Sequence, residues 1–167
     1  RSQIKKKLTI LDKRVQAKNN LPLSVIQYDE NDIINCLETL TRGWPTIGQE
    51  VRKVEKKIQK LLRIKNAIML NSGGSANFLI LYLLTSVYAK KKDKLKPGDE
   101  VITPAVTWST TVSPIIQNNL VPTLVDVNLS TYDINVNLIE KAITKKTRAI
   151  MLVQPLGQVC DMKKILN

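Results

Sequence analysis

The chain has 167 residues, 43% of them apolar, and its 26 Lys and Arg against 14 Asp and Glu give a net charge of +12. This length suits one globular domain, and the longest apolar run, Phe78 to Leu84, is too short to cross a bilayer. The basic N-terminus lacks the apolar core of a signal peptide, and Cys36 and Cys160 are not spaced as metal ligands. We therefore expect a cytoplasmic protein with reduced thiols and no metal site.

The positive charge is the one feature that would favour nucleic-acid binding. The lysines are spread over five stretches with almost no aromatic residues among them, and no helix-turn-helix or zinc-finger spacing is present. Single-strand binding uses aromatic side chains as stacking platforms. We therefore interpret most lysines as solvent-facing and expect neither a nucleic-acid nor a membrane partner. A steep salt dependence of oligonucleotide binding would support the opposite interpretation.

Residues 1–64 are expected to form an N-terminal arm followed by two helices. Asp29 can cap the first helix, which Gly43 would end. One face of this helix carries Ile33, Ile34, Leu37 and Leu40. The loop GWPTIG (43–48) follows, since two glycines and a proline exclude a regular element. The second helix has the amphipathic spacing of a buried stripe made of Val51, Val54, Ile58, Leu61 and Leu62.

From residue 65 on, β-prone runs alternate with helical ones. The predicted strands are 66–71, 100–105, 121–127 and 148–153. The predicted helices are 75–89, 114–118 with Pro114 in its first turn, 136–144, and one that begins at Asp161. Four strand–helix repeats imply βαβ crossovers. The sequence therefore predicts the α/β fold class, with a mainly parallel sheet and helices on both faces.

The turn NSGGSAN (71–77) is the first candidate site, because it lies between a predicted strand and a long apolar helix. Two glycines let backbone N–H groups converge, and the helix N-terminus adds partial positive charge. Ser72 and Ser75 add hydroxyl groups, so the turn is suited to an anion. It is neither a Walker A motif nor a dinucleotide fingerprint. The alternative is an ordinary tight turn with Ser75 as the helix N-cap.

The loop TPAVTWSTT (103–111) is the second candidate, because it directly follows another predicted strand. In an open α/β sheet, ligands bind at the carboxyl ends of the strands. Trp108 offers a flat face to an aromatic cofactor there. The alternative is a tryptophan that packs under its own loop.

The ordered segments resemble one enzyme family, DegT/DnrJ/StrS, from about residue 29 to the end. They are GWPTIGQEVRKVE, NSGGSAN, LKPGDEVITPAVTW, QNNLVPTLVDVNLSTYDIN and KTRAIMLVQPLGQVCDM. NSGGSANFLILYLLTS and TTVSPIIQNNLVP are most similar to the branch of the CDP-4-keto-6-deoxyhexose 3-dehydrases. The resemblance implies the fold type I of pyridoxal 5'-phosphate (PLP)-dependent transferases. Residues 65–167 would be the first part of its large domain, truncated before the Schiff-base residue.

The resemblance also implies roles for individual residues. Gly74 and Ser75 would hold the PLP phosphate, and Trp108 would stack on the pyridine ring. Trp44 and Thr46 would border the substrate side of the pocket. No residue is assigned as catalytic, because the family's Glu-Asp-Ala-Ala motif and its Lys, or the His of the dehydrases, come later in the family than this segment.

Two residues depart from the family pattern. Gly74 stands where relatives have Thr or Ser, so a hydroxyl donor to the phosphate is lost. Gln154 stands where many relatives carry His, which puts a sugar contact there in doubt.

The implied function is that of a PLP-dependent aminotransferase. It would pass an amino group from glutamate or a similar donor to a nucleotide-linked keto-sugar, in deoxy- and amino-sugar biosynthesis for lipopolysaccharide or O-antigen. A PLP-dependent 3-dehydrase acting on a CDP-4-keto-6-deoxy-sugar is the alternative, and a non-catalytic domain that binds phosphate or a partner is another. Relatives build their sites at a dimer interface, so a homodimer is expected. The 167 residues alone are expected to be inactive.

Overall fold

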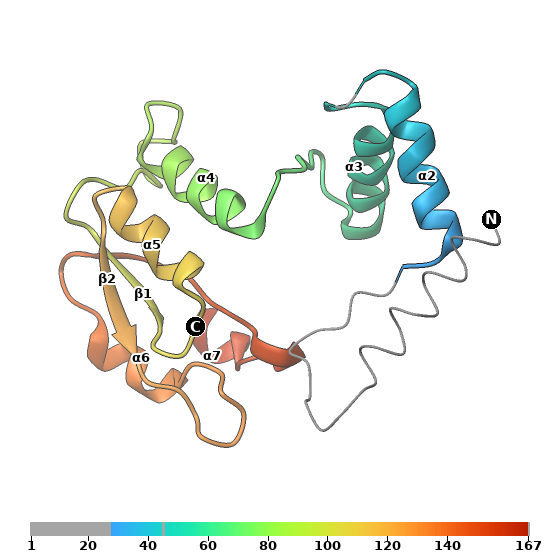
Figure 1. Cartoon of the computed structure of the whole chain (residues 1–167). Coiled ribbons are helices and arrows are strands. Elements are labelled where there is room, and N and C mark those ends of the chain that lie inside the picture. Colours follow the sequence, from blue (N-terminus) through green and yellow to red (C-terminus); the bar gives the residue numbers. More distant parts are fainter. Residues whose placement is uncertain (1–27, 45, 167) are drawn as a thin grey trace. The chain divides into compact units, whose positions relative to one another are not determined.

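A computed structural model of the chain describes residues 28–44 and 46–166. The chain divides into two compact units, Arg1–Met69 and Leu70–Asn167, and each is described by itself (Figure 1). The expected N-terminal arm lies outside the described residues. No helix in the part of the chain that the structure describes is long and apolar enough to cross a membrane.

The first unit contains two helices, α2 (Glu30–Thr41) and α3 (Gln49–Leu62). Asp29 caps α2 as predicted: its carboxylate accepts hydrogen bonds from the backbone N–H groups of Asn31 and Asp32. The Asp32 carboxylate in turn accepts one from Asp29, which completes a capping box. Gly43 has a φ of +71°, in the left-handed region that favours glycine just after a helix. The two predicted helices, the Asp29 cap and the stop at Gly43 are therefore confirmed.

The apolar stripe of α3 differs from the prediction, because neither α2 nor α3 has a buried residue. Leu61 is 76% exposed and Leu62 is 60% exposed. Helical spacing determines which side chains share a face, but it does not provide the surface that covers them. The prediction that this stripe is buried is therefore wrong for the described structure.

The predicted strand 66–71 is also wrong, because no strand forms there. Among the described residues, nothing pairs with this segment. The backbone N–H of Met69 instead donates to the Glu55 carboxylate at 2.9 Å. β-prone residues become a strand only when a neighbouring strand supplies the ladder of hydrogen bonds.

The second unit is built on a three-stranded parallel sheet, and three of the four predicted strands are confirmed. The strands are β1 (Glu100–Pro104), β2 (Val121–Val125) and β3 (Thr147–Ile150), in the order β2-β1-β3. The central strand places Ile102 opposite Thr123 of β2 and Ile150 of β3. The helices are α4 (Gly73–Thr85), α5 (Ser109–Gln117), α6 (Val136–Ala142) and α7 (Met162–Leu166), with a short 3₁₀ helix, η1 (Pro155–Gly157).

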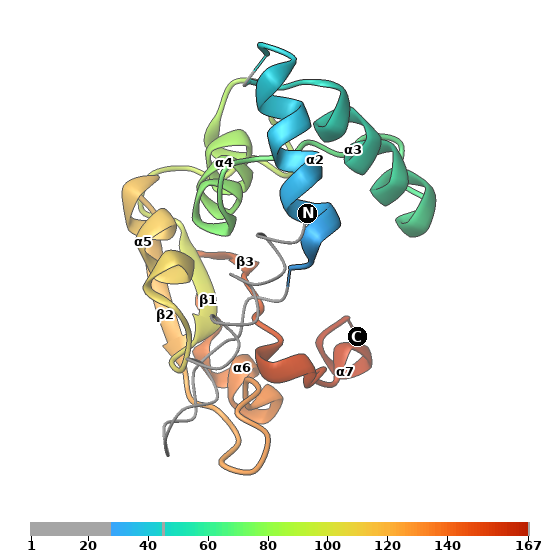
Figure 2. The same ribbon diagram turned by 45° about the vertical axis from the view of Figure 1, so that its right-hand side comes forward.

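Helices cover both faces of this sheet. Val101 of β1 packs in one core cluster with Leu81 of α4 and Ile115 of α5. The next residue, Ile102, packs in a second cluster that includes Ile139 of α6. Successive residues of a strand point to opposite faces, so the two clusters lie on opposite sides of β1. Figure 2 shows α5 and α6 on the two sides of the strands, as the α/β prediction requires.

The helix after β1 begins earlier than predicted. It starts at Ser109, so Pro114 lies in its interior and not in its first turn. Pro114 is buried, like its neighbour Ile115.

Candidate functional site

A hollow of about 460 Å³ lies at the carboxyl ends of β1 and β3, where helices α4 and α5 begin. Its lining residues are Gly73, Gly74, Asn77, Trp108, Thr110, Thr111, Met151, Leu152 and Val153. They come from both candidate segments of the sequence and from the end of the predicted strand 148–153. Ligands of open α/β sheets bind at this edge.

The N-terminus of α4 supplies the hydrogen-bond donors. Ser72 is the N-cap, and its hydroxyl accepts the N–H of Ser75 at 3.1 Å and donates to the Ser75 hydroxyl at 3.2 Å. Gly73 and Gly74 are the first two helical residues, whose N–H groups have no partner within a helix. No hydrogen bond among the described residues uses them. The free donors are thus the Gly73 and Gly74 amides, whereas the Ser75 amide, expected to face an anion, is engaged by its cap.

The two glycines differ in how closely a side chain would approach α5. A Cβ at Gly73 would meet nothing within 4 Å, whereas one at Gly74 would lie 3.3 Å from Thr110 Cγ2. At Gly74, therefore, a side chain would press against Thr110 of α5. The glycine that departs from the family pattern lets α4 and Thr110 approach closely.

Trp108 is the N-cap of α5 and is 68% exposed, so it does not pack under its own loop. The loop is tied to α5, because the Thr107 hydroxyl donates to the hydroxyl of the buried Thr111 at 2.9 Å. The backbone N–H of Thr111 also donates to the Trp108 carbonyl at 2.9 Å. A large aromatic side chain is thus presented at the hollow by a loop fixed at its end.

The carboxyl ends of the strands are joined by Thr103, which is fully buried. Its hydroxyl donates to the Met151 carbonyl at 2.9 Å, and the Met151 N–H donates to the Ile102 carbonyl at 2.7 Å. These bonds hold the segment after β3, which lines the hollow, against β1. One signal for this role is visible in the sequence: a hydroxyl residue at the end of a buried strand.

Electrostatic attraction for an anion comes here from the backbone, since no Lys or Arg is among the described residues that line the hollow. The N-termini of two helices, α4 with 13 residues and α5 with nine, border it. Each helix N-terminus is equivalent to roughly half a positive charge. The hollow can therefore hold an anion such as a phosphate, with an aromatic group beside it.

Gln154, the second departure from the family pattern, is used structurally. Its Nε2–H donates to the Cys160 thiol sulfur at 3.3 Å, and its Oε1 accepts the Cys160 N–H at 2.9 Å. The side chain bridges the loop around η1. It is not among the residues that line the hollow.

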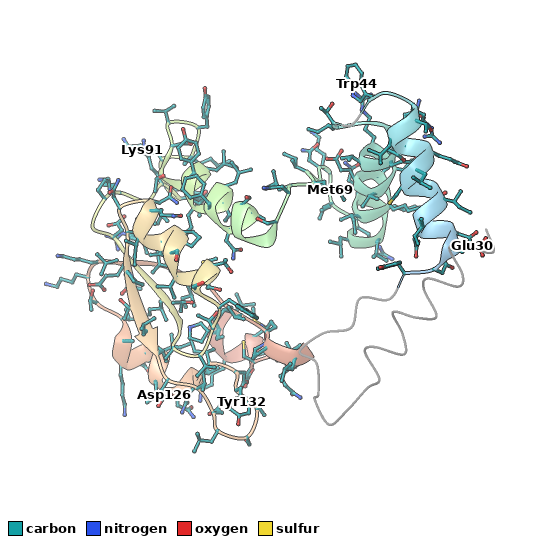
Figure 3. The ribbon with its side chains drawn as sticks, viewed as in Figure 1. Glu30, Trp44, Met69, Lys91, Asp126 and Tyr132 are labelled. Carbon is teal, nitrogen blue, oxygen red and sulfur yellow. The ribbon has the colours of Figure 1, made fainter. Side chains whose placement is uncertain are left out.

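Trp44 and Thr46 lie in the first unit, in a different hollow of about 370 Å³ at the start of α3. Trp44 is 66% exposed and projects from the loop between α2 and α3 (Figure 3). Beside it, hydrogen bonds from Lys53 and then Arg42 hold the pKa of Glu50 below its ordinary value. The charge of Arg42 is thus paired with Glu50 at 3.1 Å.

The structure brings some predicted site residues together and adds others. Gly74 and Trp108 share one hollow, with Ser75 adjacent in the same helix turn. Gly73, Asn77 and Thr110 lie within the two candidate segments, but the sequence assigned no individual role to any of them. The signal that could have identified Gly73 is its place as the first of the two adjacent glycines. Asn77 and Thr110 gain their positions only from the packing of α4 on α5.

Known proteins resemble the chain in sequence and structure. It is 42% identical over 129 residues to dTDP-4-dehydro-2,6-dideoxy-D-glucose 3-dehydratase of Saccharopolyspora spinosa, covering 77% of this chain and 28% of that protein. The solved Escherichia coli GDP-4-keto-6-deoxy-D-mannose-3-dehydratase with bound hydrated PLP is 34% identical with a TM-score of 0.78, covering 87% of this chain and 37% of that one. A putative sugar aminotransferase from Streptococcus pneumoniae in its PLP form is 32% identical with a TM-score of 0.77, covering 89% and 36%.

These likenesses confirm the α/β fold of the PLP-dependent enzymes over the part that the chain covers, which is about a third of its relatives' length. The sequence pattern of the DegT/DnrJ/EryC1/StrS aminotransferase family matches residues 27–167. The chain therefore belongs to the DegT/DnrJ/EryC1/StrS aminotransferase family.

Proposed function

We propose that this chain forms the phosphate- and ring-binding part of a PLP-dependent enzyme that acts on a nucleotide-linked keto-sugar. One observation carries the proposal: two free glycine amides at the N-terminus of α4 and an exposed Trp108 border the same hollow. An anion and an aromatic ring joined in one small molecule, as they are in PLP, match those two features. Family membership favours aminotransfer as the reaction.

The residues present fit PLP on two counts. A Cβ at Gly74 would lie 3.3 Å from Thr110 Cγ2, so the glycine lets the start of α4 pack closely against α5 beside the hollow. The donors are backbone N–H groups at a helix N-terminus, which is a common arrangement for phosphate binding. Gly73 and Gly74 would hold the phosphate with the Ser75 hydroxyl beside them, and Trp108 would cover one face of the ring. When bound, PLP supplies an electron sink for the reacting carbon.

The proposal also concerns the domain as a whole, the substrate, the amino donor and the assembly. Residues 65–167 would form the first part of the cofactor-binding domain. Trp44 and Thr46 would border the substrate, with Trp44 offering an exposed aromatic face for the nucleotide or sugar. Glutamate or a similar amino acid would be the amino donor. The full-length protein would act as a homodimer, which sedimentation would test.

A second candidate reaction is 3-dehydration, in which the sugar loses its C3 hydroxyl as water. The 42% identity to a 3-dehydratase favours it. The hollow serves both reactions equally, because both use the same cofactor.

Mass spectrometry of the sugar product tests the proposal. The full-length protein that carries this sequence is incubated with PLP, glutamate and a 4-keto-6-deoxy-sugar nucleotide. An amino-sugar product supports aminotransfer, and a product that has lost water supports dehydration. Absence of both, together with absence of PLP binding, would instead support a non-catalytic domain that binds phosphate or a partner. The 167 residues alone are expected to give no turnover.

A further inference from the structure

One backbone carbonyl of α5 lacks its usual helical partner. Pro114 lies inside the helix and has no N–H, so it cannot donate to the carbonyl of Thr110, four residues earlier. Thr110 lines the hollow, two residues after Trp108. A proline in the core of a helix therefore leaves an acceptor free at the edge of the proposed site.

The missing donor comes from the neighbouring helix. The side-chain amide of Asn77, on α4, donates to the Thr110 carbonyl at 3.1 Å, across 33 residues of sequence. Among the described residues this is the one hydrogen bond that joins α4 to α5. Asn77 itself lines the hollow, one turn along α4 from the Gly73 and Gly74 amides.

We propose that Asn77 is a positioning residue, which fixes the phosphate donors of α4 relative to Trp108 through the Thr110 carbonyl that Pro114 leaves free. The phosphate donors and the aromatic face come from different helices, so a rigid cofactor is held well only when their spacing is fixed. The hydrogen bond of Asn77 acts at that junction, as does the close packing of Gly74 against Thr110. The inference rests on the proposed function, because it takes the hollow to be the PLP site.

The test compares cofactor affinity with thermal stability in the full-length protein. The probe is pyridoxamine 5'-phosphate, which forms no covalent bond with the protein, and its Kd is measured by equilibrium dialysis. Asn77→Ala is expected to weaken binding about fivefold, the equivalent of one ordinary hydrogen bond. Asn77→Leu, which is similar in size and lacks the donor, should give the same loss if the alanine variant does not fold.

Pro114→Ala distinguishes a positioning role of Asn77 from a role in which Asn77 only supplies a hydrogen bond to the Thr110 carbonyl. It provides a helical N–H for Thr110 without restoring a link to α4. In the Pro114→Ala background, Asn77→Ala should therefore lower the melting temperature less than it does in the wild-type background. The loss of cofactor affinity caused by Asn77→Ala should remain.

Asn118→Ala is the matched control. The Asn118 amide also donates to a carbonyl of α5, that of Pro114 at 2.8 Å, but it caps the far end of the helix. Its loss should lower stability and leave the Kd unchanged.

Three outcomes would count against the inference. Unchanged affinity in Asn77→Ala would overturn it, and so would recovery of affinity in the double variant or an equal loss in Asn118→Ala. In each of these cases the wild-type protein still binds the probe, and the proposed function stands. A wild-type protein that binds neither pyridoxamine 5'-phosphate nor PLP would overturn the proposed function and this inference together.

Discussion

Gly74→Ala tests how closely the N-terminus of α4 packs against α5. A methyl group at this position would lie 3.3 Å from Thr110 Cγ2 and 3.5 Å from Thr110 Cβ. The first distance is tighter than ordinary van der Waals contact, whereas the second is normal. The outcome depends on two opposing contributions to the free energy of unfolding.

The stabilising contribution arises because alanine has a higher helix propensity than glycine, so Gly→Ala in a helix stabilises the protein by up to about 1 kcal/mol. The unfavourable one is overpacking, which costs roughly 1–3 kcal/mol in a closed core. The low end applies here because Thr110 is exposed and can shift. Gly74→Ala alone should therefore change the free energy of unfolding by no more than about 1 kcal/mol, in the destabilising direction.

Thr110→Ser removes Cγ2 and with it the tight contact. In that background Gly74→Ala should stabilise the protein by about 0.5–1 kcal/mol, so the two positions couple by about 1 kcal/mol. Urea unfolding of the four proteins in the cycle measures this coupling. Gly73→Ala, whose methyl group would meet nothing within 4 Å, is the control and should not couple to Thr110. An equal effect of Gly74→Ala in both backgrounds would refute the reasoning.

Three further predictions concern the second unit. Ile102→Ala should cost about 2–5 kcal/mol in urea unfolding, because Ile102 is fully buried in β1, whereas Ile116→Ala, at a residue 58% exposed, should cost far less. Thr103→Val should cost about 1–3 kcal/mol, since it removes the donor to the Met151 carbonyl; a cost equal to that of Thr123→Val in the edge strand would contradict this. Hydrogen bonds from Thr131 and then Asn128 lower the pKa of Asp133 in the folded protein. These bonds therefore stabilise the fold fully above the ordinary pKa of about 3.9, and this stabilisation is lost as the pH falls through the lower pKa of the folded state. Asp133→Asn should therefore flatten the dependence of stability on pH below about 4, and an unchanged profile in acid titration would count against this role.

Features set by neighbouring residues were predictable from the sequence. Asp29 caps α2 because its carboxylate reaches amides two and three residues ahead. The strands of the sheet follow from short β-prone runs bounded by turns, and β1 is confirmed within one residue of its predicted end. The paired glycines after residue 72 and Trp108 at a strand end were sufficient to locate the hollow.

Features that depend on distant partners were not predictable. The run 66–71 has strand composition but no pairing strand among the described residues. Pro114 indicated a helix start, yet it lies inside α5, where Asn77 satisfies the carbonyl that proline leaves free. The alternative interpretation of the glycine turn placed the N-cap at Ser75, but α4 begins at Gly73, so Ser72 is the N-cap and its hydroxyl engages the Ser75 amide.

The position of the cofactor phosphate tests the central claim most directly. A crystal structure of the full-length protein with bound PLP would locate it. The account predicts phosphate oxygens within about 3 Å of the Gly73 and Gly74 backbone nitrogens, with the Trp108 side chain against the pyridine ring. A phosphate bound elsewhere, with the hollow at the start of α4 empty, would contradict it.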